Sequence, residues 1–186
     1  MTLLVVFGMS VVVLLVMVAA VYNRLVKLSV RTDSAWADID VQLKRRHDLI
    51  PNLVSVVKGY ATHESATFEN VTRMRAQAME ATGPAQRAVA EGQLTAALRG
   101  LFAVAEGYPQ LRASENFLSL QNTLSEVEDA LQNARRYYNA VVRDLNTAVQ
   151  SFPTNLVAAV FSFPTRAFFE VATTAERQPA EVRFQG

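Results

Sequence analysis

Apolar residues beyond position 22 recur at alternating steps of three and four. In the first half of the chain the series is Trp36, Ile39, Leu43, Ile50, Leu53, Val57 and Tyr60, with Arg46 at one of the steps. In the second half it is Phe117, Leu120, Leu124, Val127, Leu131, Ala134, Tyr138, Val141, Leu145, Ala148 and Phe152. This spacing is typical of helices that pack against helices. No stretch of useful length alternates as a strand does, so we predict an all-α fold.

Two shorter helices are expected between the two long ones. The first covers about residues 64–81 and ends at "TGP", a stop and restart signal in which the proline suits a first helical turn. The second is Ala-rich, covers about residues 84–106 and is closed by "GYP". Short connections place neighbouring helices antiparallel. We therefore expect an elongated antiparallel bundle of two long helices, 23–60 and 114–152, and two shorter ones.

The N-terminal stretch has a different pattern. Residues 3–22, "LLVVFGMSVVVLLVMVAAVY", carry no charge, and about 20 such residues cross a bilayer as a helix. A cleaved signal peptide is the alternative, with "VAA" as an acceptable cleavage site, but no basic residue precedes the run and it exceeds the usual ~7–15-residue apolar core. We predict a membrane anchor over residues 1–22, followed by the bundle over 23–152.

The charged residues indicate an orientation in the membrane and argue against nucleic acid as a partner. The chain has 18 basic and 17 acidic residues, a balance that exerts no long-range attraction on nucleic acid. Arg24, Lys27 and Arg31 follow the apolar run and nothing basic precedes it, which favours a cytoplasmic bundle and an N-terminus outside, in the cell (inner) membrane. The absence of cysteine excludes disulfides, thiolate catalysis and Cys-ligated metals.

Arg46 is the charged residue inside the apolar series. A charge drawn into a helical interface costs several kcal/mol unless it is paired. Counting equal heights along two antiparallel helices places Arg46 near Asp129, and within one turn of Glu126 and Glu128. We predict an ion pair with Glu128, which lies beside Val127, with Glu126 or Asp129 as substitutes. The alternative is that Arg46 extends outward along its own aliphatic stem.

Pro51 interrupts the same series. Proline has no N–H to donate to the carbonyl of His47, so the helix is expected to bend or break there. Asn52 could bond to the loosened backbone, and Asp48 could cap a restarted helix. A kink that lets one long helix follow its neighbours is the simplest interpretation.

The C-terminal region divides into two parts. Residues 153–171 are unusually apolar, with Leu156, Val160, Phe161, Phe163, Phe168 and Phe169. They could cap the bundle, or enter the membrane interface or a partner. Residues 172–186 are expected to be a flexible end.

The sequence completes none of the common enzyme motifs. "HESAT" at 63–67 has Thr67 where a zincin needs its second histidine. A di-iron bundle needs two Glu-x-x-His elements, but Lys44 and Tyr60 precede the two histidines by three. Walker, G-x-S-x-G and G-x-G-x-x-G motifs are missing from the sequence. We predict a non-enzymatic protein without cofactor or metal.

A second cluster, "ARRYYNAVVRDLN" at 134–146, interleaves basic and aromatic residues. Arg135, Arg136, Tyr137 and Asn139 flank the seam residue Tyr138. Such a surface could stack on single-stranded nucleic acid. A near-neutral, membrane-tethered chain makes a protein-contact surface the better interpretation, because tyrosine and arginine are frequent at hot spots.

Two long blocks resemble the LemA family. They are "YNRLVKLSVRTDSAWADIDVQLKRRHDLIPNLVSVVKGYATHE" (22–64) and "ASENFLSLQNTLSEVEDALQNARRYYNAVVRDLNTAVQSFPTNLVAAVFSFPTRAFFE" (113–170). The resemblance implies an N-terminal membrane segment, an antiparallel helical bundle and membrane-organising work, with no reaction. The family-pattern positions that we take as structural or interaction residues are Trp36, Arg45, Arg46, Asp48, Pro51, Asn52, Glu128, Arg135, Arg136, Tyr137, Tyr138 and Asn139.

These observations favour a single-pass membrane protein that acts as a self-associating scaffold of coiled-coil-like helices in the cell envelope. The expected partners are the lipid bilayer and further copies of the chain. An adaptor that binds and regulates another membrane protein, such as a protease or transporter, is the alternative.

Overall fold

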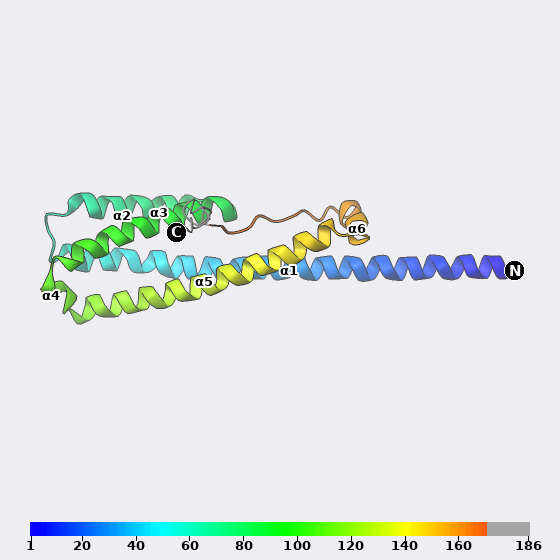
Figure 1. Ribbon diagram of the computed structural model, residues 1–186, viewed down its shortest axis with the longest axis horizontal. Coiled ribbons are helices and arrows are strands. Elements are labelled where there is room, and N and C mark those ends of the chain that lie inside the picture. Colours follow the sequence, from blue (N-terminus) through cyan, green and yellow to red (C-terminus); the bar gives the residue numbers. More distant parts are fainter. Residues whose placement is uncertain (171–186) are drawn as a thin grey trace, which may run out of the picture. The chain divides into compact units, whose positions relative to one another are not determined.

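The structure is a computed structural model that describes residues 1–170, and these residues form helices without a β-strand (Figure 1). The predicted all-α class is confirmed. The helices in chain order are α1 (Thr2–Lys58), α2 (Ser65–Glu80), α3 (Gly83–Glu106), α4 (Pro109–Arg112), α5 (Glu115–Gln150) and α6 (Thr154–Val160). They fall into two compact units: residues 1–49 with 121–168, and residues 50–120 with residues 169–170.

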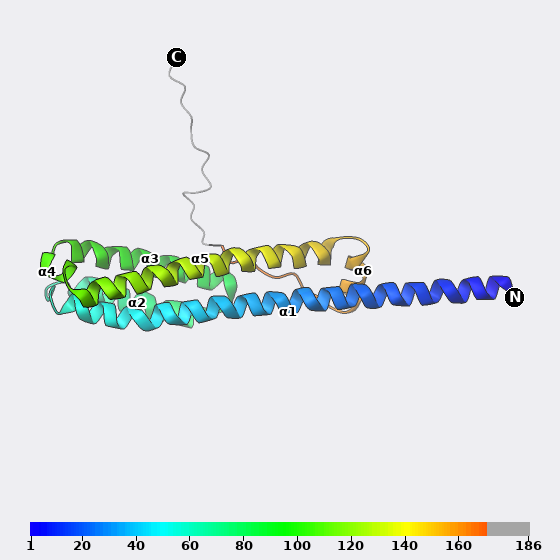
Figure 2. The same cartoon turned by 90° about the horizontal axis from the view of Figure 1, so that it is seen from below.

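The first unit is built on α1 and α5, which run antiparallel and side by side in both views (Figures 1 and 2). Its buried apolar residues largely follow the two predicted series, but Ala35 is buried more deeply than its predicted neighbour Trp36, and Phe152 at the end of the second series is 80% exposed. The buried residues are Leu25, Ala35, Ile39 and Leu43 of α1 and Leu124, Val127, Leu131, Tyr138, Val141, Val142, Leu145 and Ala148 of α5. Each large aliphatic side chain buried in this way contributes about 1.5–3 kcal/mol relative to an exposed position.

The second unit is organised by α2 and α3, which pack against each other across a two-residue connection. Phe68, Val71 and Ala78 of α2 are buried, as are Leu94, Leu98 and Leu101 of α3. Phe102 and Phe117 meet edge to face with ring centroids 6.3 Å apart. The two shorter helices expected from the sequence are therefore present, with boundaries within one residue of those predicted.

Helix α1 is one uninterrupted helix from Thr2 to Lys58, so the apolar run and the first bundle helix, which were expected as separate segments, are a single element. It also passes through Pro51, as the favoured prediction of one long helix requires, and the alternative of a break is wrong. Ile50 and Leu53 beside the proline are almost fully buried. Their packing outweighs the loss of one backbone hydrogen bond at the exposed Pro51.

Without a break, Asp48 has no restarted helix to cap, and that suggestion is also wrong. Its Oδ2 instead accepts a hydrogen bond from Lys44 Nζ at 2.7 Å, one turn earlier on the same helix face. Both side chains are more than half exposed. Such i,i+4 pairs contribute about 0.3–0.5 kcal/mol.

Two helices were not anticipated. Helices α4 and α6 have four and seven residues, too few for an apolar period to be visible. Helix α6 ends in a Schellman-type cap, in which Phe163 N–H donates to Ala158 C=O at 2.9 Å and Ser162 N–H to Ala159 C=O at 3.4 Å. Ser162 takes the left-handed conformation, with φ 56°, that this cap requires. The cap reverses the chain directly after α6.

Candidate interaction surface of the α1–α5 pair

The ion pair predicted between the long helices is present. Arg46 Nη2 lies 2.7 Å from Glu128 Oε1. The Arg46 side chain is fully buried, whereas that of Glu128 is one-third exposed (33%). The predicted pairing is confirmed, and the alternative of an outward-reaching Arg46 is wrong. The charged residue in the apolar series is thus paired across the two helices, which is a structural role.

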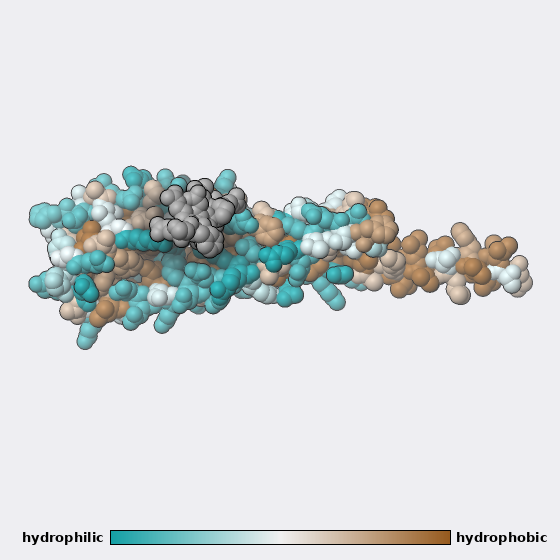
Figure 3. All heavy atoms as spheres, viewed as in Figure 1, coloured by the Kyte–Doolittle hydropathy of each residue, from teal (hydrophilic) through white to brown (hydrophobic). Residues whose placement is uncertain are grey.

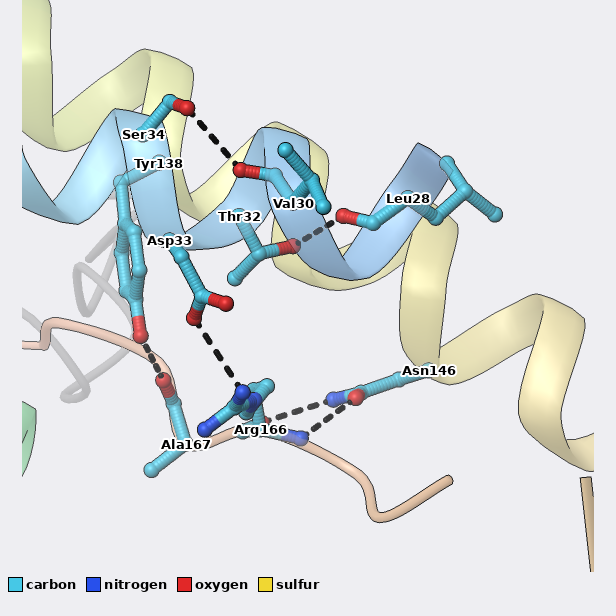
Figure 4. Close-up of polar contacts among 9 residues, drawn as sticks. All are labelled: Leu28, Val30, Thr32, Asp33, Ser34, Tyr138, Asn146, Arg166 and Ala167. Atoms are coloured by element: carbon cyan, nitrogen blue, oxygen red, sulfur yellow. Dashed lines mark hydrogen bonds and ion pairs between the residues drawn. The ribbon is translucent and has the colours of Figure 1, made fainter. Parts of the chain in front are cut away.

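Trp36 and Tyr138 meet across the same pair of helices, with ring centroids 5.3 Å apart. The Tyr138 hydroxyl donates to the carbonyl of Ala167 at 2.9 Å (Figure 4). Burial is the main reason that the pKa of Tyr138 is raised above its ordinary value; the Arg166 cation opposes this rise and the Asp33 carboxylate adds to it. Tyr138 thus joins α1, α5 and the segment after α6.

The segment after α6 is held at a second residue, Arg166. Asn146 Nδ2 donates to the Arg166 carbonyl at 2.9 Å, and the Arg166 N–H donates to Asn146 Oδ1 at 2.8 Å. The Arg166 guanidinium also reaches Asp33 Oδ1 of α1 at 3.1 Å. Figure 4 shows these contacts converging from α1, α5 and the extended segment. We call Asp33, Tyr138, Asn146, Arg166 and Ala167 the clamp.

Arg31 and Tyr137 form an exposed pair beside the clamp. Arg31 Nε donates to the Tyr137 hydroxyl at 2.9 Å, and its guanidinium carbon lies 5.4 Å from the centre of that ring. The hydrogen bond to Tyr137 is the main reason that the pKa of Arg31 is raised above its ordinary value. Tyr137 remains 43% exposed. A fixed, exposed arginine–tyrosine pair is the residue combination that protein interfaces favour.

The remaining predicted site residues do not gather at one place. Arg45 and Asn52 are exposed on α1, and Asp48 pairs with Lys44. On α5, Arg136 bonds the side chain of Asn133 on its own helix, while Arg135 and Asn139 are partly buried. The cluster at 134–146 is therefore shared between the seam, through Tyr138, and the exposed surface, through Tyr137.

One exposed feature of α1 was missed from the sequence. Val30, Ser34, Ala37 and Val41 follow steps of four, three and four, and all four are exposed. Val30 and Val41 are 58% and 50% exposed. We call these four residues the α1 stripe. The same spacing rule that identified the buried seam could have found it, because helices place residues three and four apart on one face.

The apolar tail is divided between core and surface. Ala158 of α6 packs with Leu25 and Ala148, so this part of the tail caps the α1–α5 pair, which is one of the alternatives that the sequence left open. Tyr22 meets Phe161 and Phe163 edge to face, with centroids 4.8 and 5.7 Å apart. The opposite side is open, with Phe152 80%, Leu156 58%, Val160 77% and Phe161 50% exposed. Residues 171–186 lie outside the described chain.

The N-terminal part of α1 is exposed. Every residue from 1 to 17 is exposed, and α1 is long enough and apolar enough to cross a membrane. Figure 3 shows this hydrophobic stretch and the hydrophobic atoms over the neighbouring α6. Among residues 1–170, no group of three or more His, Asp or Glu side chains is arranged to hold a metal ion.

Comparison with known proteins gives a consistent family. Residues 35–184 match the model of the LemA family. Magnetosome protein MamQ 2 of Paramagnetospirillum magneticum is 26% identical over 194 residues, which cover 90% of this chain and 71% of that protein. Protein LemA of Metamycoplasma hominis is 25% identical over 154 residues, covering 81% of this chain and 69% of that protein. None of these names is that of an enzyme.

Proposed function

We propose that this chain, which belongs to the LemA family, is a non-enzymatic single-pass membrane protein whose α1–α5 pair assembles with further copies of itself. In this proposal residues 1–22 anchor the chain and 23–152 form the assembling bundle. The apolar tail that begins at residue 153 lies next to the membrane. The bundle lies on the cytoplasmic side of the cell membrane, the side favoured by Arg24, Lys27 and Arg31.

The observation that carries self-association is the α1 stripe. Apolar and small residues at steps of four, three and four form a seam that a second helix can fill. The stripe has no charged member, and its two valines are at least half exposed. Anchoring all copies in one membrane raises their effective concentration, so a modest contact suffices. A scaffold needs only such a surface and a fixed position.

The mass of the full-length protein in mild detergent tests this proposal. We expect an oligomer for the wild type and a monomer for the double variant Val30→Glu with Val41→Glu, because two carboxylates in each facing seam repel and remain poorly solvated. Met79→Glu with Val89→Glu is the matched control, since both residues are exposed to a similar degree but lie on α2 and α3. A monomeric wild type, or equal dissociation of the two double variants, contradicts the proposal.

The second candidate is an adaptor that binds another membrane protein, such as a protease or transporter. The Arg31–Tyr137 pair favours it, because it presents an ordered cation and an exposed ring. Tyr137→Ala should then release a co-purifying partner on detergent extraction while leaving the self-association of the chain intact. Loss of both, or of neither, argues against a separate adaptor surface.

A further inference from the structure

Helix α6 lies beside the point where α1 emerges from the apolar stretch. The series 3–22 corresponds to about 30 Å of helix at 1.5 Å per residue, which is the thickness of a bilayer core. The first α1 residue buried in the bundle is Leu25, and it packs on Ala148 and Ala158. Of the described residues of the first unit, only those of α1 continue beyond this level toward the N-terminus (Figures 1 and 2). Helix α6 therefore sits at the height of the membrane boundary.

The outward side of this element is apolar and uncharged. Residues 151–165, "SFPTNLVAAVFSFPT", contain no charged residue. A large apolar surface is exposed on one side of this element, whereas Ala158 on the opposite side is buried. The exposed residues are Phe152, Leu156, Val160 and Phe161. Such a surface needs a cover, because exposed apolar patches of this kind mark interaction sites. We call these four residues the foot.

The position of the foot is fixed by contacts on both sides. Tyr22 stacks edge to face on Phe161 and Phe163, which joins the foot to the last apolar turn of α1. Aromatic side chains concentrate at the membrane–water boundary, where an apolar body and a polar tip are both accommodated. The clamp holds the chain again at Arg166 and Ala167. The exposed Arg24 and Lys27 lie just beyond this level on α1, where lipid phosphates would be.

We propose that the foot is a second membrane contact, inserted into the lipid interface of the bilayer that α1 crosses. Lipid is the occupant because the foot is continuous with the exposed apolar surface of α1 and lies at the height where that surface ends. The chain then both crosses the bilayer, through α1, and lies in its interface, through the foot. Because the foot is attached to α1, the helix cannot rotate freely about its own axis. This inference rests on the membrane span of the proposed function but not on self-association.

Depth measurement by spin labelling tests the contact. The chain has no cysteine, so a single introduced cysteine takes the only label. Full-length Val160→Cys is labelled with a nitroxide and reconstituted into vesicles of phosphatidylcholine and phosphatidylglycerol. Collision with oxygen, which concentrates in lipid, is compared with collision with a water-soluble nickel complex. We expect the oxygen-to-nickel ratio at position 160 to exceed several-fold that at Val89→Cys, an exposed position on α3.

Each other outcome overturns the inference in a distinguishable way. A label at 160 that collides mainly with nickel, while a label at Val13→Cys collides mainly with oxygen, shows that the span is in lipid but the foot is not. Low collision with both reagents at 160 shows that a second copy or another protein covers the foot. A label at Val13 that collides mainly with nickel contradicts the span itself, and with it the proposed function.

A second variant controls for distortion of the foot by the nitroxide label itself. Leu156→Asp with Val160→Asp changes two side chains that face away from the packed side of α6, so the fold should persist. A label at Phe152→Cys should lose its oxygen preference in this background and keep it when Met79→Asp is introduced instead. An unchanged preference at 152 in both backgrounds overturns the proposal.

Discussion

The guanidinium of Arg46 lies 2.7 Å from the carboxylate of Glu128, and this ion pair connects α1 to α5 from inside the seam. Burying one of two charges is tolerated only while the pair is intact, so removing the partner is more harmful than replacing both residues by apolar ones. We therefore expect the pair to favour one register of the two helices. The neighbouring members of the two series, such as Leu43, Val127 and Leu131, are buried and apolar.

Glu128→Ala should lower the free energy of unfolding by about 2–3 kcal/mol, because it leaves the buried Arg46 without this carboxylate. For a chain of this size that corresponds to roughly 5–10 °C in the thermal midpoint, measured by circular dichroism of the full-length protein in detergent. Glu126→Ala, two residues earlier on α5 and exposed, is the control and should change the midpoint little. Equal midpoints for the two variants would show that the ion pair has no stabilising role.

Pro51→Ala should stabilise the protein. Pro51 is exposed inside a continuous helix, and proline in a helix interior is about 3 kcal/mol less favourable than alanine. We expect a gain of about 1–3 kcal/mol, seen as a higher midpoint in chemical denaturation. Ser55→Ala, at another exposed position one turn later, should give well under 1 kcal/mol. A loss of stability in Pro51→Ala would mean that the native backbone at this turn requires proline.

Tyr138 should make stability depend on pH in the alkaline range. Its pKa is raised in the folded state, so the folded chain holds this proton more tightly than the unfolded chain does. The contribution of the protonated hydroxyl is complete below the ordinary tyrosine pKa of about 10 and is lost as pH rises through the higher folded value. Denaturation midpoints should therefore fall from pH 9 to 11 more steeply for the wild type than for Tyr138→Phe.

At neutral pH the same variant, Tyr138→Phe, reports on the hydrogen bond to Ala167. Its loss leaves a carbonyl without this donor and should cost about 1 kcal/mol. Tyr137→Phe provides the matched control, because Tyr137 is exposed and its hydroxyl bonds Arg31 rather than the segment after α6. Parallel pH profiles for wild type and Tyr138→Phe would contradict the role of Tyr138.

Asn146→Ala should release the segment after α6. The side chain of Asn146 makes two hydrogen bonds with the backbone of Arg166, and alanine makes neither. Trypsin cleaves after arginine, so the bond between Arg166 and Ala167 should be cut several-fold faster in the variant. Asp33→Ala is the control, because it removes only the exposed ion pair and retains the backbone contacts. Equal cleavage in the two variants would remove Asn146 from the clamp.

A reporter fused after Gly186 tests the orientation. In the proposed orientation the C-terminus is in the cytoplasm, so a cytoplasm-active reporter should be active and a periplasm-active one silent. Replacing Arg24, Lys27 and Arg31 by glutamine should reduce this bias. A periplasmic signal from the unmodified protein would reverse the proposed topology.

Regular helices made much of the first unit predictable. Arg46 and Glu128 could be paired from the sequence because two long helices rise by the same distance per residue, so equal counts from a shared end give equal heights. Trp36 and Tyr138 follow from the same reasoning. Pro51 could not be decided in this way, because the outcome depends on how strongly the neighbouring Ile50 and Leu53 are packed.

The clamp and the foot were beyond this reasoning. The segment containing Arg166 has no repeating pattern, so nothing in the sequence indicates that Asn146 and Asp33 would bind it. The division of the tail into a buried and an open side depends on the reversal at Ser162, a position where the left-handed conformation is not signalled by glycine. The apolar character of the tail was visible, but its two sides were not.

The absence of a joint in α1 where the apolar stretch meets the bundle has a mechanical consequence. Because α1 runs uninterrupted from the bare stretch into its seam with α5, a span that leans in the bilayer must lean the helix pair with it. A hydrocarbon layer thinner than the apolar run makes such a span tilt. The tilt of the helix pair relative to the bilayer normal would then depend on the thickness of the bilayer.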